Sequence, residues 1–195
     1  AATTCGFLGS LSTDVSQKVF DKCTQYILPR GPDRFNSLVT EGVRLAHARL
    51  EIQGGEHGTQ PVVSDCGRYA LVYNGEIYNS HDLRQRLGLA STNDLGDTAI
   101  LFEALILHGA EVVVPMLDGI FAFVFLNHSA RKVWLVRDRF GTKPLFYSQK
   151  GGLSFSSHAV ALYRMLGSSA DLGISGLIHY LGYHTPISPE TIFEG

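Results

Sequence analysis

Residues 69–79 read Tyr-Ala-Leu-Val-Tyr-Asn-Gly-Glu-Ile-Tyr-Asn and carry the clearest local structural signal in the chain. Aromatic, aliphatic and β-branched side chains fill 69–73, which favours a β-strand. The Asn74-Gly75 pair is typical of a tight turn and predicts that the strand ends there. An asparagine amide and a glycine N–H at a strand end can also donate hydrogen bonds to an oxyanion, although an ordinary turn is the simpler interpretation.

Short strands and amphipathic helices surround this stretch on both sides. The run 120–126 is nearly all apolar, as expected for a strand covered on both faces, and it forms a predicted hairpin with 133–136. The pattern as a whole predicts an α+β layered domain. Strands are expected at 7–11, 43–52, 69–73, 120–126, 133–136, 145–147 and 153–156, and helices at 14–28, 81–87, 97–108, 157–166 and 174–181.

The composition is that of a globular domain with a real core. Of the 195 residues, 45% are hydrophobic, and the formal net charge of −2 gives no basic field for nucleic acid. No apolar run approaches the roughly 20 residues of a membrane span, and residues 1–11 lack the pattern of a signal peptide. The odd, sparse count of three cysteines argues against a disulfide framework and makes the cytoplasm the expected location. No pair has CxxC spacing, which argues against a zinc site.

Three residues are candidates for chemistry on local grounds, each with a plainer alternative. Cys5 has the thiol of a strong nucleophile, but most free cysteines are small buried hydrophobes. Arg49 lies in an apolar segment and needs an anionic partner, either a substrate carboxylate or a structural salt bridge. Asp97 suits a substrate ammonium group or the N-cap of a helix equally well. Structural or surface roles are expected for four histidines without metal-binding spacing: His47, His57, His81 and His158.

Several motifs, taken together and in order, favour the chemical roles of these residues over the structural ones. The most specific are the Asn-Gly-Glu-Ile-Tyr-Asn block at 74–79 and the Arg-Asp-Arg-Phe-Gly-Thr-Lys-Pro block at 137–144. The other segments are 5–9 (CGFLG), 30–33 (RGPD), 45–50 (LAHARL), 60–61 (QP), 117–123 (LDGIFAF), 145–147 (LFY) and 191–195 (TIFEG). In this order and over nearly the whole chain, these motifs closely resemble the class II glutamine amidotransferase domain of asparagine synthetases.

The resemblance implies an N-terminal-nucleophile hydrolase fold, a four-layer αββα arrangement with two antiparallel sheets between helical layers. It also implies hydrolysis of L-glutamine to L-glutamate and ammonia. In the matching positions, Cys5 attacks the amide carbon and its own α-amino group shuttles the proton. Asn74 and the Gly75 N–H hold the oxyanion of the tetrahedral intermediate.

The resemblance also assigns the substrate pocket. Arg49 binds the carboxylate of glutamine, Asp97 binds its α-ammonium group, and the backbone near Leu50, Ile52 and Glu76 completes the pocket. No metal or cofactor is expected within residues 1–195.

In the family, an ATP-dependent synthetase domain follows and receives the ammonia. ATP and magnesium are implied there, with aspartate as the default acceptor. Residues 191–195 match the start of the linker to that domain, and 137–147 are expected to support the interface. The expected partners are therefore L-glutamine, the synthetase domain and, as an open alternative, a second copy of the chain.

The chain departs from the family pattern at its start, where Ala1-Ala2-Thr3-Thr4 precede the cysteine as a leader or tag. A peptide bond on the nitrogen of Cys5 removes the base of the mechanism. The alternative reading is a catalytically silent domain, as in β-lactam-synthetase relatives. Retention of the five candidate residues (Cys5, Arg49, Asn74, Gly75 and Asp97) favours the enzyme. Smaller departures are Gly96, Ala99 and His158, where the family commonly has Ser, Glu and an acidic residue.

Overall fold

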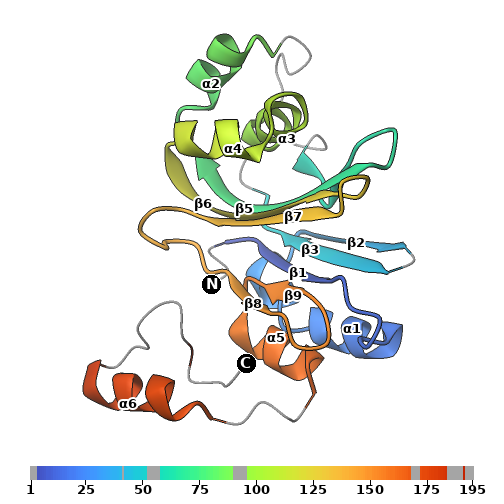
Figure 1. The fold of residues 1–195 in the computed structure, drawn as a ribbon, viewed down its shortest axis with the longest axis vertical. Helices are drawn as coiled ribbons and strands as arrows, with labels where there is room; N and C mark the ends of the chain where they lie inside the picture. The colour runs from blue at the N-terminus through green and yellow to red at the C-terminus, as the bar shows by residue number, and fades with distance from the viewer. Residues whose placement is uncertain are drawn as a thin grey trace.

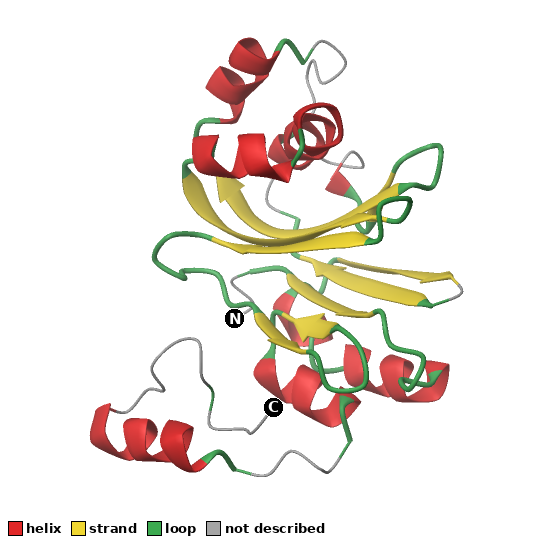
Figure 2. Ribbon diagram, viewed as in Figure 1, coloured by secondary structure: helices red, strands yellow, loops and turns green. Residues whose placement is uncertain are grey.

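Two antiparallel sheets lie face to face, and helices cover the outer side of each (Figures 1 and 2). The structure is a computed structural model that describes residues 4–40, 42–51, 58–89, 96–167, 172–183 and 191. The order of layers is helix, sheet, sheet, helix, which confirms the expected four-layer αββα arrangement of the α+β class.

The first sheet has β1 (Gly6–Ser10) at its centre, and all five β1 residues are buried. Helices α1 (Gln17–Thr24) and α5 (Ala159–Met165) cover its outer face, and a 3-10 turn, η1 (Leu28–Arg30), follows α1. The strand order is β2-β3-β1-β9-β8. These strands are β1 (Gly6–Ser10), β2 (Arg34–Thr40), β3 (Val43–Arg49), β8 (Phe146–Ser148) and β9 (Ser154–Ser156).

The second sheet has the order β4-β5-β6-β7 and lies under the other helical layer. Its strands are β4 (Val62–Val63), β5 (Tyr69–Ile77), β6 (Gly119–Asn127) and β7 (Lys132–Arg137). The helices over its outer face are α2 (Ser80–Leu87), α3 (Asp97–His108), α4 (Ala110–Val113) and the 3-10 turn η3 (Val114–Met116). The predicted hairpin is confirmed, because β6 and β7 pair antiparallel up to Asn127 and Lys132.

Alternation along the strands separates the core into layers. In β6, Phe121, Phe123 and Phe125 pack against the helices, whereas Ala122 and Val124 pack against the opposite sheet. Successive side chains of a strand point to opposite faces, so an apolar run such as 120–126 serves two cores at once. The prediction of a strand buried on both sides is confirmed.

The expected turn at Asn74-Gly75 is wrong. Strand β5 runs through both residues to Ile77, and all nine of its residues have register partners in β6, including Asn74 opposite Ala122 and Gly75 opposite Phe121. Continuous ladder pairing outweighs the local turn preference of the dipeptide.

The helix expected at 14–28 is shorter than predicted. It begins after Ser16, whose hydroxyl caps the Val19 N–H, and it ends at Thr24. The apolar face predicted for it nevertheless packs into the core, with Val15, Phe20, Cys23 and Ile27 buried and Val19 and Tyr26 half-buried. Strand β2 was not foreseen, because most of its residues are exposed and show little apolar periodicity.

Helix α6 (Ile174–Tyr183) lies apart from the sheets, at the lower left of Figure 1, and only Gly176 is buried in it. Within the described residues, no single helix is long and apolar enough to span a membrane. Helix α3 and the 110–116 segment together meet the length and composition criteria, but they are bent by 118° relative to each other.

Candidate active site

Strand alternation brings the candidate residues to the space between the two sheets. In β3, Val43 and Leu45 pack between the sheets, so His47 and Arg49 share their face. In β5, Val72 packs there, and Asn74 follows it two residues later. All three polar side chains are buried.

Cys5 is half-buried and directly precedes the central strand β1. Its Sγ lies 3.4 Å from the Leu50 N and 3.7 Å from the Leu50 O, so it can accept from one and donate to the other. Burial raises the pKa of the Cys5 thiol, while the Leu50 N–H and the charges of Arg49, Lys143 and Arg30 act to lower it. Burial makes the thiolate unfavourable, but the N–H group and the cations around it stabilise its negative charge.

Asn74 carries a buried amide with spare donor capacity. Its Oδ1 accepts a hydrogen bond from the Thr4 hydroxyl at 2.7 Å, whereas its Nδ2 has no partner among the described residues. An unpaired buried donor is uncommon and costs free energy. A binding site requires such an unpaired donor when its ligand supplies the hydrogen-bond acceptor.

Gly75 is adjacent to Asn74 and is enclosed by β6. A Cβ added to it would collide with the Ile120 carbonyl oxygen and lie 2.6 Å from the Phe121 Cα. Only glycine allows β5 and β6 to approach this closely. Gly75 therefore maintains the strand pairing that positions the neighbouring Asn74.

Arg49 is buried at the end of β3, next to Leu50. A Cβ added to Gly58 would lie against its guanidinium, 2.7 Å from Cζ, so the backbone there leaves no room for a side chain. Leu50 contacts Cys5, as described above, but Ile52 lies outside the described residues.

Asp97 is the first residue of α3 and is half-buried. Gly96 occupies the N-cap position, so the carboxylate of Asp97 does not cap its own helix. Its Oδ2 instead accepts from the Tyr73 hydroxyl at 2.6 Å and from the Ile77 N–H at 3.0 Å. These bonds attach the start of α3 to both sides of Asn74-Gly75 on β5. The side chain of Glu76, on the same segment, is exposed.

Arg30 and Lys143 received no role at the site from the sequence, and His47 was expected to be structural or at the surface. Arg30 donates from Nε to the Cys5 carbonyl at 3.2 Å, and Lys143 donates from Nζ to the Thr4 hydroxyl at 3.4 Å. His47 joins the sheets through Nε2 and the Tyr73 carbonyl, 3.0 Å apart. All three occur within motifs that carry the family resemblance, which was the available signal.

His158, where the family resemblance has an acidic residue, is the N-cap of α5. Its Nδ1 accepts from the Ala161 N–H at 3.4 Å, and its ring stacks on Tyr26. The imidazole thus does what a carboxylate would do at this helix start.

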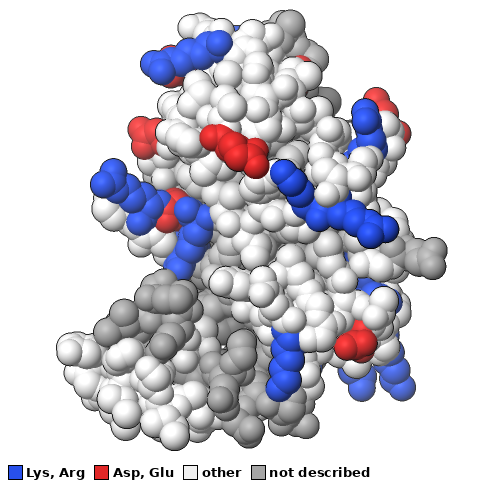
Figure 3. Space-filling view, in the orientation of Figure 1, with Lys and Arg blue, Asp and Glu red and all other residues white. Residues whose placement is uncertain are grey.

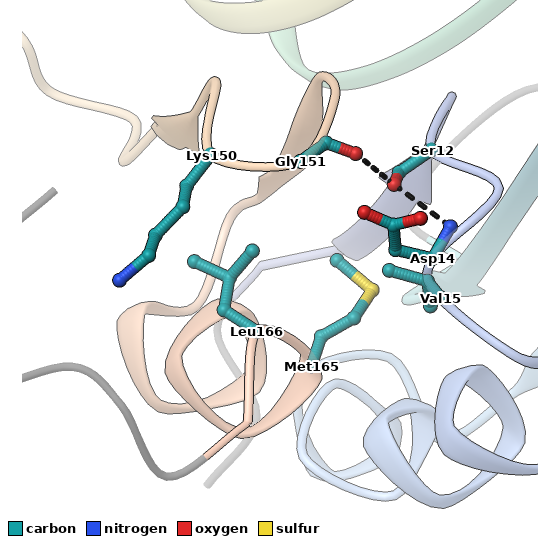
Figure 4. A pocket seen from close by; sticks show the side chains of 7 residues that line it. All are labelled: Ser12, Asp14, Val15, Lys150, Gly151, Met165 and Leu166. Atoms are coloured by element: carbon teal, nitrogen blue, oxygen red, sulfur yellow. Dashed lines mark hydrogen bonds between the residues drawn. The ribbon is translucent and has the colours of Figure 1, made fainter.

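A separate small pocket lies beyond the opposite end of β1 from Cys5 (Figure 4). The hydroxyl of Ser12 bridges the Gly151 carbonyl and the Asp14 N–H at its rim. Strand β1 separates this pocket from the candidate site. Among the described residues, no group of three or more His, Cys, Asp or Glu side chains is placed to hold a metal ion. The pocket is lined by Ser12, Asp14, Val15, Lys150, Gly151, Met165 and Leu166.

Known proteins that are similar in sequence identify the family of the chain. A family model described as a glutamine amidotransferase domain matches residues 4–195. The chain is 32% identical over 185 residues to asparagine synthetase [glutamine-hydrolyzing] 3 of Bacillus subtilis, covering 92% of this chain and 30% of the relative. It is also 32% identical to the asparagine synthetase [glutamine-hydrolyzing] of Gallus gallus, covering 85% of this chain and 30% of that protein. The chain therefore spans about a third of the length of these relatives.

Proposed function

The chain belongs to the glutamine amidotransferase domain family, and from this premise we propose that it hydrolyses the side-chain amide of L-glutamine to L-glutamate and ammonia. The observation that carries the proposal is the buried amide of Asn74, whose Nδ2 is unpaired among the described residues and whose Oδ1 is bonded to Thr4, the residue next to Cys5. Acyl transfer through an oxyanion requires a nucleophile and an unused donor in the same site.

In the proposed reaction, the Cys5 sulfur forms a bond to the amide carbon of glutamine while its proton passes to the α-amino group of Cys5. The carbonyl oxygen becomes an oxyanion that accepts from Asn74 Nδ2 and the Gly75 N–H. The C–N bond then breaks, and the α-amino group gives its proton to the departing ammonia. Water hydrolyses the thioester and restores the thiol. Removing one such oxyanion donor, as in Asn74→Ala, is expected to lower kcat by about 10²- to 10³-fold.

Substrate recognition is proposed to rest on two opposite charges. The buried guanidinium of Arg49 binds the α-carboxylate of glutamine in a bidentate manner. Asp97 binds the α-ammonium group while Tyr73 and Ile77 hold its carboxylate in place. Backbone groups near Leu50, Ile52 and Glu76 are proposed to complete the pocket.

Activity requires Cys5 as the first residue, because an α-amino group in a peptide bond is not a base. Thr4 also occupies the site, with its hydroxyl between Asn74 and Lys143. We therefore propose that the residues before Cys5 are absent from the working enzyme.

The experiment compares the chain starting at Ala1 with the same chain starting at Cys5, each verified by intact mass, in a glutamate-release assay. The shortened chain should turn over glutamine, and Cys5→Ala should abolish this. The exposed Cys66→Ala is the matched control and should retain activity. A shortened, folded chain that releases no glutamate would refute the proposal.

The contacts of Thr4 favour a second candidate, a catalytically silent domain that serves folding or partner contacts. Calorimetric titration with glutamine discriminates between the two. Binding at millimolar glutamine by the shortened chain supports the enzyme, and absence of binding supports the silent domain.

The ammonia is proposed to pass to an ATP- and magnesium-dependent synthetase domain, with asparagine as the default product. The length of the relatives supports a further domain. The surface around Phe140, a side chain that is 90% exposed, is the proposed interface, and basic side chains gather on the side where the β7–β8 connection projects (Figures 1 and 3). A second copy of the chain is an alternative occupant of this interface.

The cytoplasm is the proposed location, which the three free thiols support.

The coupled reaction is testable in a longer protein that contains both domains. With aspartate, ATP and magnesium, ¹⁵N from the amide of glutamine should appear in asparagine. Label recovered only as free ammonia would contradict the coupling while leaving the glutaminase proposal intact.

A further inference from the structure

The turn at 138–143 is held by one buried carboxylate. Asp138 Oδ1 accepts from the N–H groups of Phe140 and Thr142, at 3.1 and 2.9 Å. Its Oδ2 accepts from the N–H groups of Phe121 and Lys143, at 3.2 and 3.0 Å. Burial by itself raises the pKa of Asp138, but the backbone donors outweigh it and hold this pKa below its usual value. The turn is therefore built around a charged acceptor.

The same carboxylate connects the turn, through β6, to β5, the strand that carries the proposed oxyanion donors. Phe121, which donates to Asp138 Oδ2, is the register partner of Gly75 on β5. Lys143 donates to the same oxygen through its own N–H. Arg137 braces the turn from outside by donating from Nε to the Lys143 carbonyl at 2.7 Å. The backbone of Lys143 is thereby fixed relative to the strand that carries Asn74 and Gly75.

The side chain of Lys143 crosses to the N-terminal side of the cysteine. Its Nζ lies 3.4 Å from the hydroxyl of Thr4, which immediately precedes Cys5. The same hydroxyl donates to Asn74 Oδ1. The ammonium group is thus placed on the flank of Cys5 where the proposed oxyanion donors lie.

Four titratable groups from different elements bear on the thiol. Arg49 on β3, Arg30 at the end of η1 and Lys143 on the turn are cations that favour the thiolate. The Tyr73 phenol on β5 has its pKa raised well above its usual value, first by burial and then by Asp97, so it stays neutral. In the proposed complex, the substrate carboxylate offsets the charge of Arg49. Lys143 and Arg30 then carry the positive potential at Cys5.

We propose that Lys143 is a positioning residue for the nucleophile: the Asp138-centred turn holds its ammonium beside Cys5, where it stabilises the thiolate and the anionic intermediate. The catalytic part of this inference rests on the proposed glutaminase function, whereas the effect on the thiol does not.

The test uses the chain that starts at Ala1, because it keeps Thr4, which Lys143 contacts. It measures the alkylation rate of Cys5 by iodoacetamide across pH 6–10, read by mass spectrometry of the Cys5 peptide. A Cys66→Ser background removes the exposed competing thiol. Lys143→Met should slow alkylation at pH 7.5 by about threefold to tenfold and move the midpoint to higher pH. Lys143→Arg should keep the original profile. Lys150→Met is the matched control, because this exposed lysine lies by the pocket beyond the opposite end of β1, and it should also leave the profile unchanged.

Two further measurements keep the inference falsifiable. Lys143→Gln, with circular dichroism as a check of folding, should reproduce the Lys143→Met profile. Asp138→Asn should shift the profile in the same direction, because it releases the turn. Coincidence of the Lys143→Met and Lys143→Gln profiles with the parent would overturn the inference. Absence of glutamate release from the shortened parent chain would refute the proposed function instead, whatever the alkylation profiles show.

Discussion

His47 links protonation to the stability of the site. Burial lowers the pKa of His47 from 6.5 to about 4, and Nε2 donates to the Tyr73 carbonyl next to Asn74. The unfolded chain therefore binds more protons than the folded chain between these two values, so stability is present above pH 6.5 and is lost as pH falls toward 4. Lowering the pH from 7.5 to 5.0 should cost about 2 kcal/mol through this residue alone.

The assay is urea unfolding at pH 7.5 and 5.0 for the parent and for His47→Gln, whose amide can still donate to the Tyr73 carbonyl. The pKa of His158 is also lowered, first by burial, so it adds to the parent's pH dependence and remains in the variant. The difference between the two proteins isolates His47 and should be about 2 kcal/mol. The exposed His81→Gln is the control and should keep the parent's pH dependence. Equal pH dependence in the parent and His47→Gln would refute the reasoning.

Three other variants probe the site. Gly75→Ala should lower the free energy of unfolding by about 1–3 kcal/mol and reduce glutamate release, because its Cβ would collide with the Ile120 carbonyl oxygen; an equally stable variant in urea would show that the strands can separate at little cost. Arg49→Lys should raise the KM for glutamine by about tenfold or more with a smaller effect on kcat, since a bidentate contact is lost; an unchanged KM would remove Arg49 from the pocket. Asp138→Ala should destabilise the chain by about 2–4 kcal/mol in urea above pH 5, because four backbone donors lose their acceptor; a loss below about 0.5 kcal/mol would show that water replaces the carboxylate.

The course of β5 illustrates where local sequence signals mislead. Asn74-Gly75 is a strong turn signal when only its neighbours are considered. The partner that overrides it is β6, which lies more than 40 residues away in the sequence and pairs with every residue of β5. The glycine is explained by its close approach to Ile120 rather than by a turn. The oxyanion role of Asn74 and Gly75 stays a prediction, whereas the turn expected at these residues is a strand.

The placement of Lys143 shows the same limit on the candidate site. Its motif was recognised as specific, yet no role followed, because its distance to Thr4 depends on a side chain crossing between segments 139 residues apart. Asp97 is a related case. Its carboxylate does not cap α3 but accepts from Tyr73 and Ile77, which only the folded chain brings near, and its role in a substrate pocket stays a prediction.

Cys5 occurs in a motif near the start of the chain, and its thiol contacts the backbone of Leu50, 45 residues further along. The sequence by itself determined the α+β class, the alternation that sends His47 and Arg49 to one face of β3, and the family to which the chain belongs. These follow from periodicity and motifs, which are local properties. Only the tertiary structure decided that Asn74 and Gly75 stand within a strand, and that the Asp138 turn brings a lysine to the cysteine. Both depend on sheet pairing and on desolvated hydrogen bonds between distant segments, whose energies no short stretch of sequence contains.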